Sequence, residues 1–304
     1  MTILRIATRK SSLAWWQAQW VQQQLQQAHP ELSIELLGFS TQGDKILDTP
    51  LAKIGGKGLF TKELEVALLE GEADIAVHSI KDIPVSFPVG LFLAAICERD
   101  DPRDAFVSNH YTNFSELPPN ACVGTASLRR QSQLLALRPD LCIQPLRGNV
   151  NTRLAKLDAG DYDAIILSTA GLERLSFEGR IQQRLAIDLC LPAVGQGTIG
   201  VECRSDDSRV QQWLKALHHL PSAICISAER AVNARLQGGC QVPIAAHAQI
   251  REDTLFIEAL VAQPDGKLII KDSVQGALDK AEYLGCQLAE QLLAQGADKI
   301  LAAL

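Results

Sequence analysis

Five arginines and only one acidic residue, Asp140, lie in the segment 124–153. The segment has no lysine, so it carries a formal charge of +4 within a chain whose net charge is −6. Because a guanidinium group stays protonated and offers a planar fork of donors, such a cluster suits carboxylate or phosphate. The alternative is a solvated basic helix face. The five are Arg129, Arg130, Arg138, Arg147 and Arg153.

The sequence around these arginines favours the anion site. Arg129 and Arg130 follow the letters GTAS, and Arg147 stands in LRGNVNTR, both of which are typical of loops at strand ends. Ligands of open α/β sheets bind at that edge. Nucleic acid fits poorly, because no aromatic side chain interleaves the arginines to stack on bases. The segment GGKGLF, residues 55–60, lacks the spacing of a phosphate loop and predicts a mobile lid instead.

A carboxylate stands beside this cationic region of the sequence. Asp82 follows Lys81 directly after the apolar run 73–78, which is typical of a strand buried on both faces. Such an acid can hold or pass a proton, or stabilise positive charge that develops on a substrate. A structural ion pair between Asp82 and one of the arginines is the alternative. His78, inside the apolar run, is interpreted as a hydrogen-bonded core histidine.

Cys240 differs from the other seven cysteines. It stands in RLQGGCQVP, where Gly238 and Gly239 remove side-chain bulk just before the thiol. No His-containing dyad accompanies it, so the attachment of a permanent covalent group is favoured over hydrolysis. The others lack the spacing of a zinc site. Their apolar flanks, as at Cys97 and Cys142, predict small buried core residues.

Short apolar runs alternate with helical patterns, which predicts an α/β fold with largely parallel sheets. Residues 3–8 are expected to form a strand, and apolar residues at helical spacing follow to position 25, capped by Ser11 or Ser12. A repeat at an offset of 89 residues aligns 68–79 with 157–168 and predicts two similar lobes. The charged segment 99–104 is interpreted as a hinge between them. After Pro221, three alternating segments and a last helix predict a smaller α+β domain.

The chain is expected to act in the cytoplasm and without a membrane. Its longest apolar stretch, 89–97, has nine residues, far fewer than the roughly 20 that a membrane-spanning helix needs. Arg5, Arg9 and Lys10 interrupt any secretion signal near the N-terminus.

Six blocks of the sequence resemble the hydroxymethylbilane synthase family, also called porphobilinogen deaminase. They appear in the order of that family: RIATRKSSLAWWQAQ, AVHSIKDIP, GTASLRRQ, LRGNVNTR, LPAVGQG and ERAVNARLQGGCQVPIA. The resemblance runs from residue 5 to beyond residue 240. Ala126 departs from it, because a hydroxyl residue is frequent at that position.

The resemblance implies three domains. Two are lobes like those of periplasmic binding proteins, with mainly parallel sheets, and the third is a small C-terminal α+β domain with a three-stranded antiparallel sheet. The first lobe would comprise residues 1–98 and 197–216, the second 103–192, and the C-terminal domain 220–304.

The resemblance also implies a reaction. The family condenses four porphobilinogen molecules head to tail, with loss of ammonia at each step, and water then releases the linear tetrapyrrole hydroxymethylbilane for haem and porphyrin biosynthesis. It uses a dipyrromethane primer as cofactor and no metal. We expect a monomer. The rival hypothesis, a two-lobed protein that binds a small polyanion without reaction, leaves Cys240 and Asp82 unexplained.

Carried over by position, the resemblance assigns roles to individual residues. Cys240 would hold the dipyrromethane through a thioether, and Asp82 would be the catalytic carboxylate that also contacts the cofactor. The remaining cofactor contacts would be Lys81, Thr125, Ser127, Arg129 and Arg130. Substrate and the growing chain would meet Arg9, Arg147, Arg153, Arg174, Gln17, Ser79 and Gln196, and a mobile loop would include Lys57 and Phe60.

Overall fold

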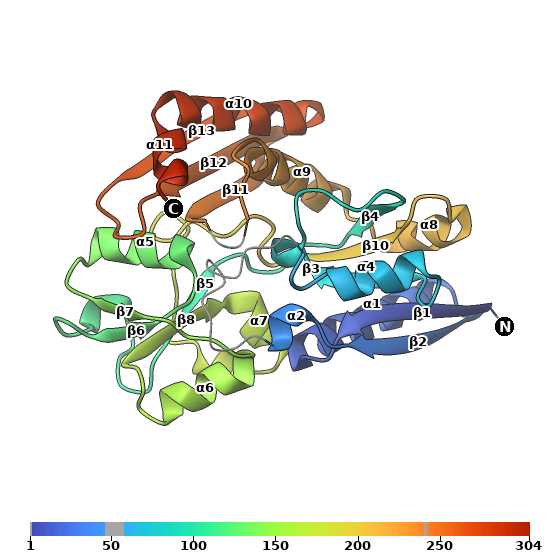
Figure 1. The fold of residues 1–304 in the computed structure, drawn as a ribbon, viewed down its shortest axis with the longest axis horizontal. Coiled ribbons are helices and arrows are strands. Elements are labelled where there is room, and N and C mark those ends of the chain that lie inside the picture. The colour runs from blue at the N-terminus through green and yellow to red at the C-terminus, as the bar shows by residue number, and fades with distance from the viewer. Residues whose placement is uncertain (1, 46–57, 240–241) are drawn as a thin grey trace. The chain divides into compact units, whose positions relative to one another are not determined.

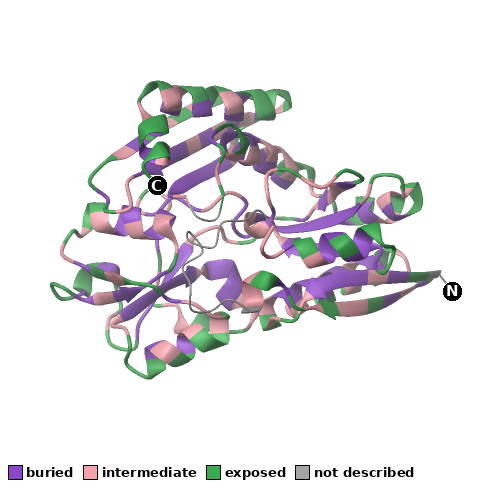
Figure 2. Cartoon of the chain, viewed as in Figure 1, coloured by how far each residue is buried: buried purple, intermediate pink, exposed green. Residues whose placement is uncertain are grey.

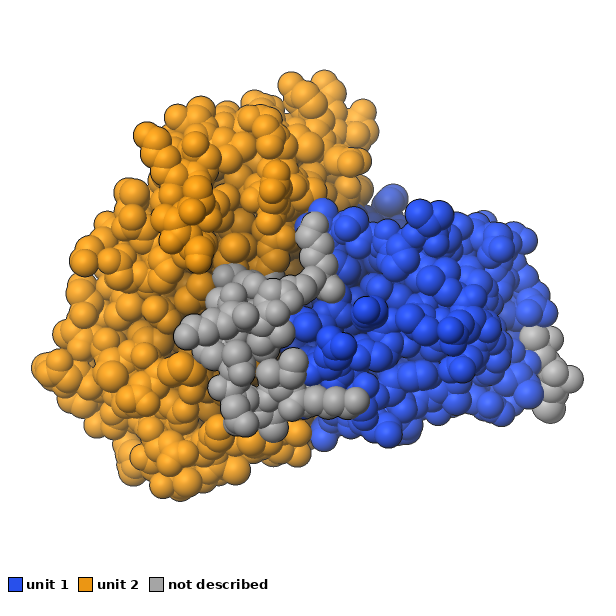
Figure 3. All heavy atoms as spheres, in the orientation of Figure 1, with its two compact units in different colours: residues 1–48, 56–100, 198–223 blue, residues 49–55, 101–197, 224–304 orange. Residues whose placement is uncertain are grey.

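The computed structural model describes residues 2–45, 58–239 and 242–304, with two compact units that Figure 3 colours separately. Within the described residues, unit 1 comprises 2–45, 58–100 and 198–223, and unit 2 comprises 101–197, 224–239 and 242–304. The chain thus leaves unit 1 after residue 100 and returns to it at residue 198. The finer division into three domains stays a prediction.

Unit 1 is built on a five-stranded sheet with the strand order β2-β1-β3-β10-β4 (Figure 1). Strands β2, β1 and β3 run parallel, whereas β10 runs antiparallel to both β3 and β4. Apolar residues of α1 such as Val21 and Leu25 are fully buried against this sheet, as the helical spacing predicts. The elements are β1 Thr2–Arg9, α1 Ser12–Ala28, β2 Leu32–Phe39, α2 Gln42–Lys45, α4 Lys62–Leu69, β3 Ile75–Ser79, β4 Leu91–Ile96, β10 Ile199–Arg204 and α8 Ser208–Leu214.

The second five-stranded sheet, in unit 2, has the order β7-β6-β8-β5-β9 and repeats the pairing pattern of the first. Its strands β7, β6 and β8 run parallel, and β5 runs antiparallel to β8 and β9. In each sheet four of the five strands therefore point in one direction, and one strand, β10 or β5, points the opposite way, so both sheets are mixed. The elements are β5 Asp104–Val107, β6 Cys122–Gly124, α5 Leu128–Leu137, β7 Cys142–Gln144, α6 Val150–Asp158, β8 Ala164–Ser168, α7 Thr169–Arg174 and β9 Gln183–Arg184.

The repeat in the sequence corresponds to a repeated structural device. Asp74 precedes β3 and accepts a hydrogen bond from the backbone N–H of Arg5 at 2.8 Å. Asp163 precedes β8 and accepts from the backbone N–H of Cys122 at 2.7 Å. In both places the acid ties the start of one strand to its parallel neighbour. The repeat is therefore a feature of the fold in each unit and not a coincidence of letters.

The third sheet is antiparallel, as expected, with the order β11-β12-β13. One face carries a core of apolar side chains shared with three helices, including Val232, Ile257 and Leu288. Figure 2 shows β11 and β12 largely buried and the outward helix faces exposed. With the two mixed α/β sheets, this sheet confirms the predicted architecture. The elements are α9 Leu220–Arg235, β11 Ile244–Arg251, β12 Thr254–Ala262, β13 Ile269–Ala277, α10 Ala281–Ala294 and α11 Ala297–Ala302.

The prediction for the cysteines is only partly right. Cys97, Cys190, Cys203 and Cys225 are buried, but Cys142 is exposed. Its apolar neighbours Leu141 and Ile143 gave a misleading signal, because β7 is an edge strand of its sheet.

The turn between β12 and β13 packs tightly against α5. Gly266 has a φ of +73°, and a Cβ atom there would lie 2.5 Å from the backbone nitrogen of Ala136. Gln131 of α5 donates a hydrogen bond to the carbonyl of Pro264 at 3.1 Å. The turn thus positions the helix whose first turn carries Arg129 and Arg130.

We expect Gly266→Ala to destabilise unit 2 more than Gly160→Ala does. Both glycines have positive φ, but a Cβ atom at Gly160 meets nothing within 4 Å, so this variant reports the backbone cost alone. Overpacking at Gly266 should add about 1–3 kcal/mol. Hydrogen exchange of the α5 amides and the thermal unfolding midpoint measure the difference. Equal effects of the two substitutions would show that the turn is not packed as described.

Candidate functional site

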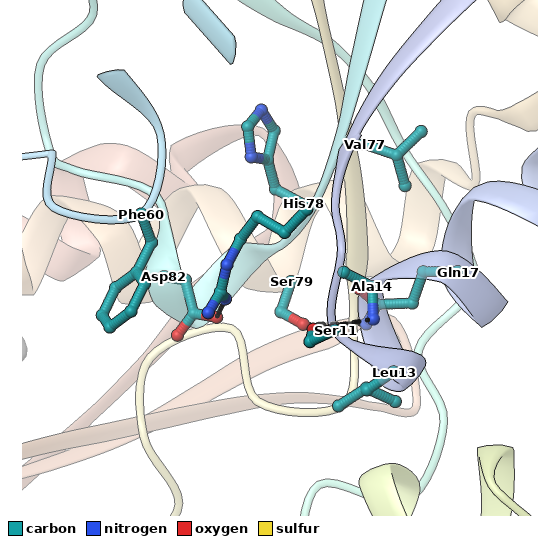
Figure 4. Close-up of a pocket in the computed structure, with 10 residues that line it drawn as sticks. Ser11, Leu13, Ala14, Gln17, Phe60, Val77, His78, Ser79 and Asp82 are labelled. Carbon is teal, nitrogen blue, oxygen red and sulfur yellow. Dashed lines mark hydrogen bonds and ion pairs between the residues drawn. The ribbon is translucent and has the colours of Figure 1, made fainter. Parts of the chain in front are cut away.

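A small pocket in unit 1 collects five of the residues singled out by the sequence: Arg9, Gln17, Phe60, Ser79 and Asp82. Its cavity volume is about 40 Å³. Figure 4 shows how the labelled side chains lie around it. The carboxyl ends of two parallel strands, β1 and β3, supply most of the polar groups, because strands that run together end at one edge of the sheet.

Arg9 is held on three sides. Its guanidinium Nε and Nη2 donate to the carboxylate of Asp44, and Nη1 lies 3.7 Å from Oδ2 of Asp82. The ring of Phe60 stacks below the guanidinium, with its centroid 4.4 Å from Cζ, a cation–π contact. This arrangement leaves the guanidinium oriented toward Asp82. Arg9 and Phe60, predicted as separate elements of the site, lie together.

Asp44 is a site residue that the sequence reasoning missed. The hydroxyl of Thr41 donates to its Oδ2 at 2.7 Å. Burial opposes ionisation of Asp44, but the hydrogen bonds and charge of Arg9 outweigh it and hold the pKa of the carboxyl below its ordinary value. The Asp44 carboxylate is therefore a fixed counter-charge for Arg9. The spacing of Thr41 and Asp44 in the sequence is typical of a structured turn, but it does not indicate that Asp44 pairs with Arg9.

Gln17 and Ser79 form one hydrogen-bonded pair. The side-chain amide of Gln17, on α1, donates to the hydroxyl of Ser79 at 2.7 Å (Figure 4). The residue Ser11 caps α1 by accepting from the backbone of Ala14, so it fixes where this helix begins. Both residues line the same pocket of unit 1, and their role in binding stays a prediction. Lys81 and Asp82 lie in the short 3-10 helix Ile80–Asp82 that follows β3.

His78 is a core residue, as interpreted from the sequence. Its Nε2 lies 3.1 Å from Oε2 of Glu202, and both side chains are almost completely buried. The ring points away from Asp82 and Ser79 in Figure 4. His78 is therefore not placed to exchange protons with a substrate beside Asp82.

The second group of predicted residues surrounds Asp104 in unit 2. Nη1 of Arg129 donates to Oδ2 of Asp104 at 2.7 Å, and Nη2 of Arg130 donates to Oδ1 at 2.7 Å. The amide of Gln196 also donates to Oδ1, at 2.9 Å. Asp104 is fully buried, and Arg129 and Arg130 are only 4% and 6% exposed. The alternative of a solvated basic helix face is therefore wrong for these two arginines.

Charge compensation keeps this buried group ionised. Burial disfavours the Asp104 carboxylate, but the charges and hydrogen bonds of Arg129 and Arg130 hold its pKa far below the ordinary value. Burial and the nearby carboxylate raise the pKa of the Cys190 thiol to about 12, so it stays a neutral thiol. One carboxylate thus faces two guanidinium groups. The sequence reasoning missed Asp104 because the acid lies in the segment interpreted as a hinge, well before the arginines in the chain.

Thr125 and Ser127 form the turn that starts α5. Ser127 caps the helix by accepting from the backbone N–H of Arg130 at 3.4 Å, and the hydroxyl of Thr125 accepts from the backbone N–H of Ser127 at 3.2 Å. The N-terminus of a helix favours anions through its backbone N–H groups and its dipole. Ala126, where the family pattern has a hydroxyl, is exposed.

Three further arginines belong to unit 2. Nε of Arg153 donates to the carbonyl of Gly148 at 2.8 Å, and Nη2 of Arg174 donates to the carbonyl of Gly197 at 2.8 Å. Partial burial lowers the pKa of Arg147. The five arginines of segment 124–153 therefore do not share one environment. Arg138 pairs with Asp140 at the surface.

Two predicted residues, Lys57 and Cys240, lie outside the described residues. Within the described ranges, no three His, Cys, Asp or Glu side chains converge as metal ligands would. No helix in the described part of the chain combines the length and apolar character that crossing a bilayer requires.

We expect Asp104→Asn to cost about 3–5 kcal/mol at neutral pH, because it leaves two buried guanidinium groups without their counter-charge. Folding lowers the pKa of the Asp104 carboxyl, so the carboxylate contributes its full stabilisation of the fold above the unfolded pKa near 3.8. This stabilisation is lost as the pH falls below that value. The difference from wild type should therefore shrink in acid. Urea unfolding across this pH range measures it.

The matched control is Asp140→Asn, which removes a carboxylate from the surface pair with Arg138. It should change stability little at any pH. A small effect at Asp104, or one that does not depend on pH, would contradict the compensation described here.

The fold defines a class: a protein with two mixed α/β sheets in two lobes and a three-stranded antiparallel sheet near the C-terminus. Similar structures include the VFT2 domain of BvgS from Bordetella pertussis, at 16% identity over 75% of this chain and 92% of that chain, TM-score 0.45. The aliphatic sulphonate binding protein SsuA from Escherichia coli is similar at 17% identity over 78% of this chain and 71% of that chain, TM-score 0.42. These similarities concern fold alone.

Family models identify the chain within this class. One described as "Porphobilinogen deaminase, dipyromethane cofactor binding domain" matches residues 4–212, and one described as "Porphobilinogen deaminase, C-terminal domain" matches residues 223–294. The chain belongs to the porphobilinogen deaminase family. It is a transferase that uses a dipyrromethane cofactor to make hydroxymethylbilane from porphobilinogen in tetrapyrrole biosynthesis.

Proposed function

We propose that Asp82 is the catalytic carboxylate of this reaction. The observation that carries the proposal is its position in the unit 1 pocket, with a side chain 30% exposed and Nη1 of Arg9 3.7 Å away. Loss of ammonia from porphobilinogen leaves positive charge on the pyrrole, and a fixed carboxylate stabilises that charge as it develops. The carboxylate also accepts hydrogen bonds from pyrrole N–H groups, which orients a ring for attack.

Each unit by itself offers donors that suit the carboxylates of a cofactor. In unit 2 the start of α5 offers backbone N–H groups, and Asp104 balances only one of the two guanidinium charges of Arg129 and Arg130. The excess positive charge favours a bound anion. The cofactor supplies the pyrrole carbon on which the chain is started. Cofactor contacts are assigned to Lys81, Thr125, Ser127, Arg129 and Arg130, with Asp82 at the pyrrole nitrogens.

The substrate and the growing chain also carry carboxylates, and a second set of residues is assigned to them. Arg9 is oriented by Asp44, so one edge of its fork is occupied and Nη1 is the edge that faces the pocket. Gln17 and Ser79 form a hydrogen-bonded wall of the same pocket. The full set is Arg9, Gln17, Ser79, Arg147, Arg153, Arg174 and Gln196.

Cys240 is the proposed attachment point of the cofactor, and the loop with Lys57 and Phe60 is the proposed lid. The support for Cys240, which lies outside the described residues, is the Gly-Gly sequence before it. Phe60 supports the lid by its stacking on Arg9. A cytoplasmic, monomeric enzyme is proposed from the sequence.

We expect the purified protein to exceed its polypeptide mass by two substituted pyrroles, and Cys240→Ser to lose that excess. The cofactor-free variant should also unfold at a lower temperature, because the clustered arginines lose bound counter-charges. Intact mass spectrometry and thermal unfolding measure both. Cys286→Ser, which alters a partly buried thiol on α10, should keep the excess mass. A bare polypeptide mass in the wild type would favour a simple polyanion-binding protein.

We expect Asp82→Asn to keep the cofactor mass but to lower kcat at least 100-fold, because the amide cannot stabilise positive charge. Glu35→Gln, which neutralises an exposed carboxylate on β2 of the same unit, should leave the rate unchanged. The release of ammonia from porphobilinogen measures turnover. A near-normal rate in the Asp82 variant would remove this residue from the mechanism.

A further inference from the structure

Two free cysteines stand directly opposite each other in the second sheet. Cys122 begins β6, Cys142 begins β7, and the two are partners in the parallel register. The backbone N–H of Cys142 donates to the carbonyl of Ala121 at 2.9 Å, which fixes this register. Nothing in the reaction of the family uses either thiol, and neither lies in the two groups of site residues described above.

The register places the Cα atoms of the two cysteines at a separation that a disulfide can span. Neighbouring strands lie about 4.8 Å apart. Disulfides join Cα atoms roughly 4.4–6.8 Å apart, so the spacing of adjacent strands lies within that range. Side chains of partnered residues also project from the same face of a sheet. The spacing and the shared face therefore both suit a disulfide between Cys122 and Cys142.

The pair is accessible from solvent, unlike most of the other thiols. Cys142 is exposed on the edge strand and Cys122 is half-buried, whereas Cys97, Cys190, Cys203 and Cys225 are buried. Among the described cysteines, only Cys286 on α10 shares partial exposure. A reagent in solution can thus reach Cys142 first.

The surroundings of the two thiols differ. Burial, followed by the neighbouring Cys142 and Asp163, raises the pKa of the Cys122 thiol. The Sγ atom of Cys122 lies 3.8 Å from the carbonyl oxygen of Asp161, and the side-chain amide of Gln144 donates to Sγ of Cys142 at 3.8 Å. Cys142, which accepts a hydrogen bond and faces solvent, is therefore better placed to attack first, and Cys122 to act second.

We propose that Cys122 and Cys142 are a reversible modification site that closes to a disulfide by exchange with a low-molecular-weight disulfide such as glutathione disulfide. The Cys142 thiolate attacks one glutathione sulfur and releases the other glutathione as a thiolate. Cys122 then loses its proton and attacks Sγ of Cys142, which releases the second glutathione. Overall two protein thiols lose two protons and two electrons, and glutathione disulfide is reduced to two glutathione molecules.

The bond would link two strands that lead into the arginine-bearing segments. β6 continues into Thr125 and α5, and β7 continues toward Arg147. The backbone N–H of Thr125 already donates to the carbonyl of Gln144 at 2.9 Å. A covalent link at the start of both strands would add a reducible tie to these hydrogen bonds.

The test is incubation of the complete, cofactor-bearing protein with excess glutathione disulfide, followed by alkylation, intact mass measurement and peptide mapping. The expected product loses the mass of two hydrogen atoms and two alkylation sites, yields a linked peptide pair with Cys122 and Cys142, and is restored by a thiol reductant. Cys142→Ser and Cys122→Ser should not lose that mass. Cys286→Ser should behave as wild type.

Three results would overturn the proposal. One is a pair of thiols that both stay open to alkylation, and another is a glutathione adduct that persists on Cys142. The third is a bond from either residue to a different cysteine. Because the wild-type protein itself gives each result, a variant that fails to fold does not affect the conclusion.

Discussion

The ion pairing of Asp104 with Arg129 and Arg130 is the constraint on which unit 2 depends. Two guanidinium groups in a nearly closed interior would be very costly without a carboxylate, since burial penalises each charge by several kcal/mol. Asp104 comes from the first residue of β5, and both arginines come from the first turn of α5, so the pair joins a sheet to the helix beside it. One negative charge against two positive charges leaves the group cationic. The same interaction that stabilises the fold therefore also underlies the anion site proposed at Arg129 and Arg130.

In both units the proposed site residues lie at the same edge of a similar sheet. In unit 1, Arg9 ends β1 and Asp82 follows β3. In unit 2, Thr125 follows β6 and Arg147 follows β7. The carboxyl ends of parallel strands place loops and helix N-termini together, and these supply donors without distorting the core. The repeated acid before β3 and β8 secures the strand starts at the opposite end.

Much of this was predictable from the sequence. Apolar periodicity predicted the first strand and the helix after it, and the repeat of residues 68–79 at 157–168 predicted two similar lobes. The sequence favoured more than a solvated surface for the arginines of segment 124–153. The burial of Arg129 and Arg130 confirms this for those two residues. The motifs also supported the family, which the family models then confirmed for residues 4–212 and 223–294.

The rest depended on contacts between distant parts of the chain. The sequence around Asp104 and Asp44 contains no pattern that identifies their arginine partners. Strand β10 joins the sheet of unit 1 only after the chain has passed through unit 2. The exposure of Cys142 follows from the edge position of β7, which apolar neighbours cannot reveal. Partners far apart in sequence are set by tertiary packing, so residue types at short spacing cannot identify them.

The packing of Gly266 on α5 limits how this hairpin can vary. Many surface hairpins accept added residues, because loop length changes closure entropy only slowly. Here the turn fills a space bounded by the backbone of Ser132 and Ala136, so a longer loop would have to lift away from the helix. A fusion tag or reporter domain would be tolerated poorly at this hairpin, even though part of it faces solvent.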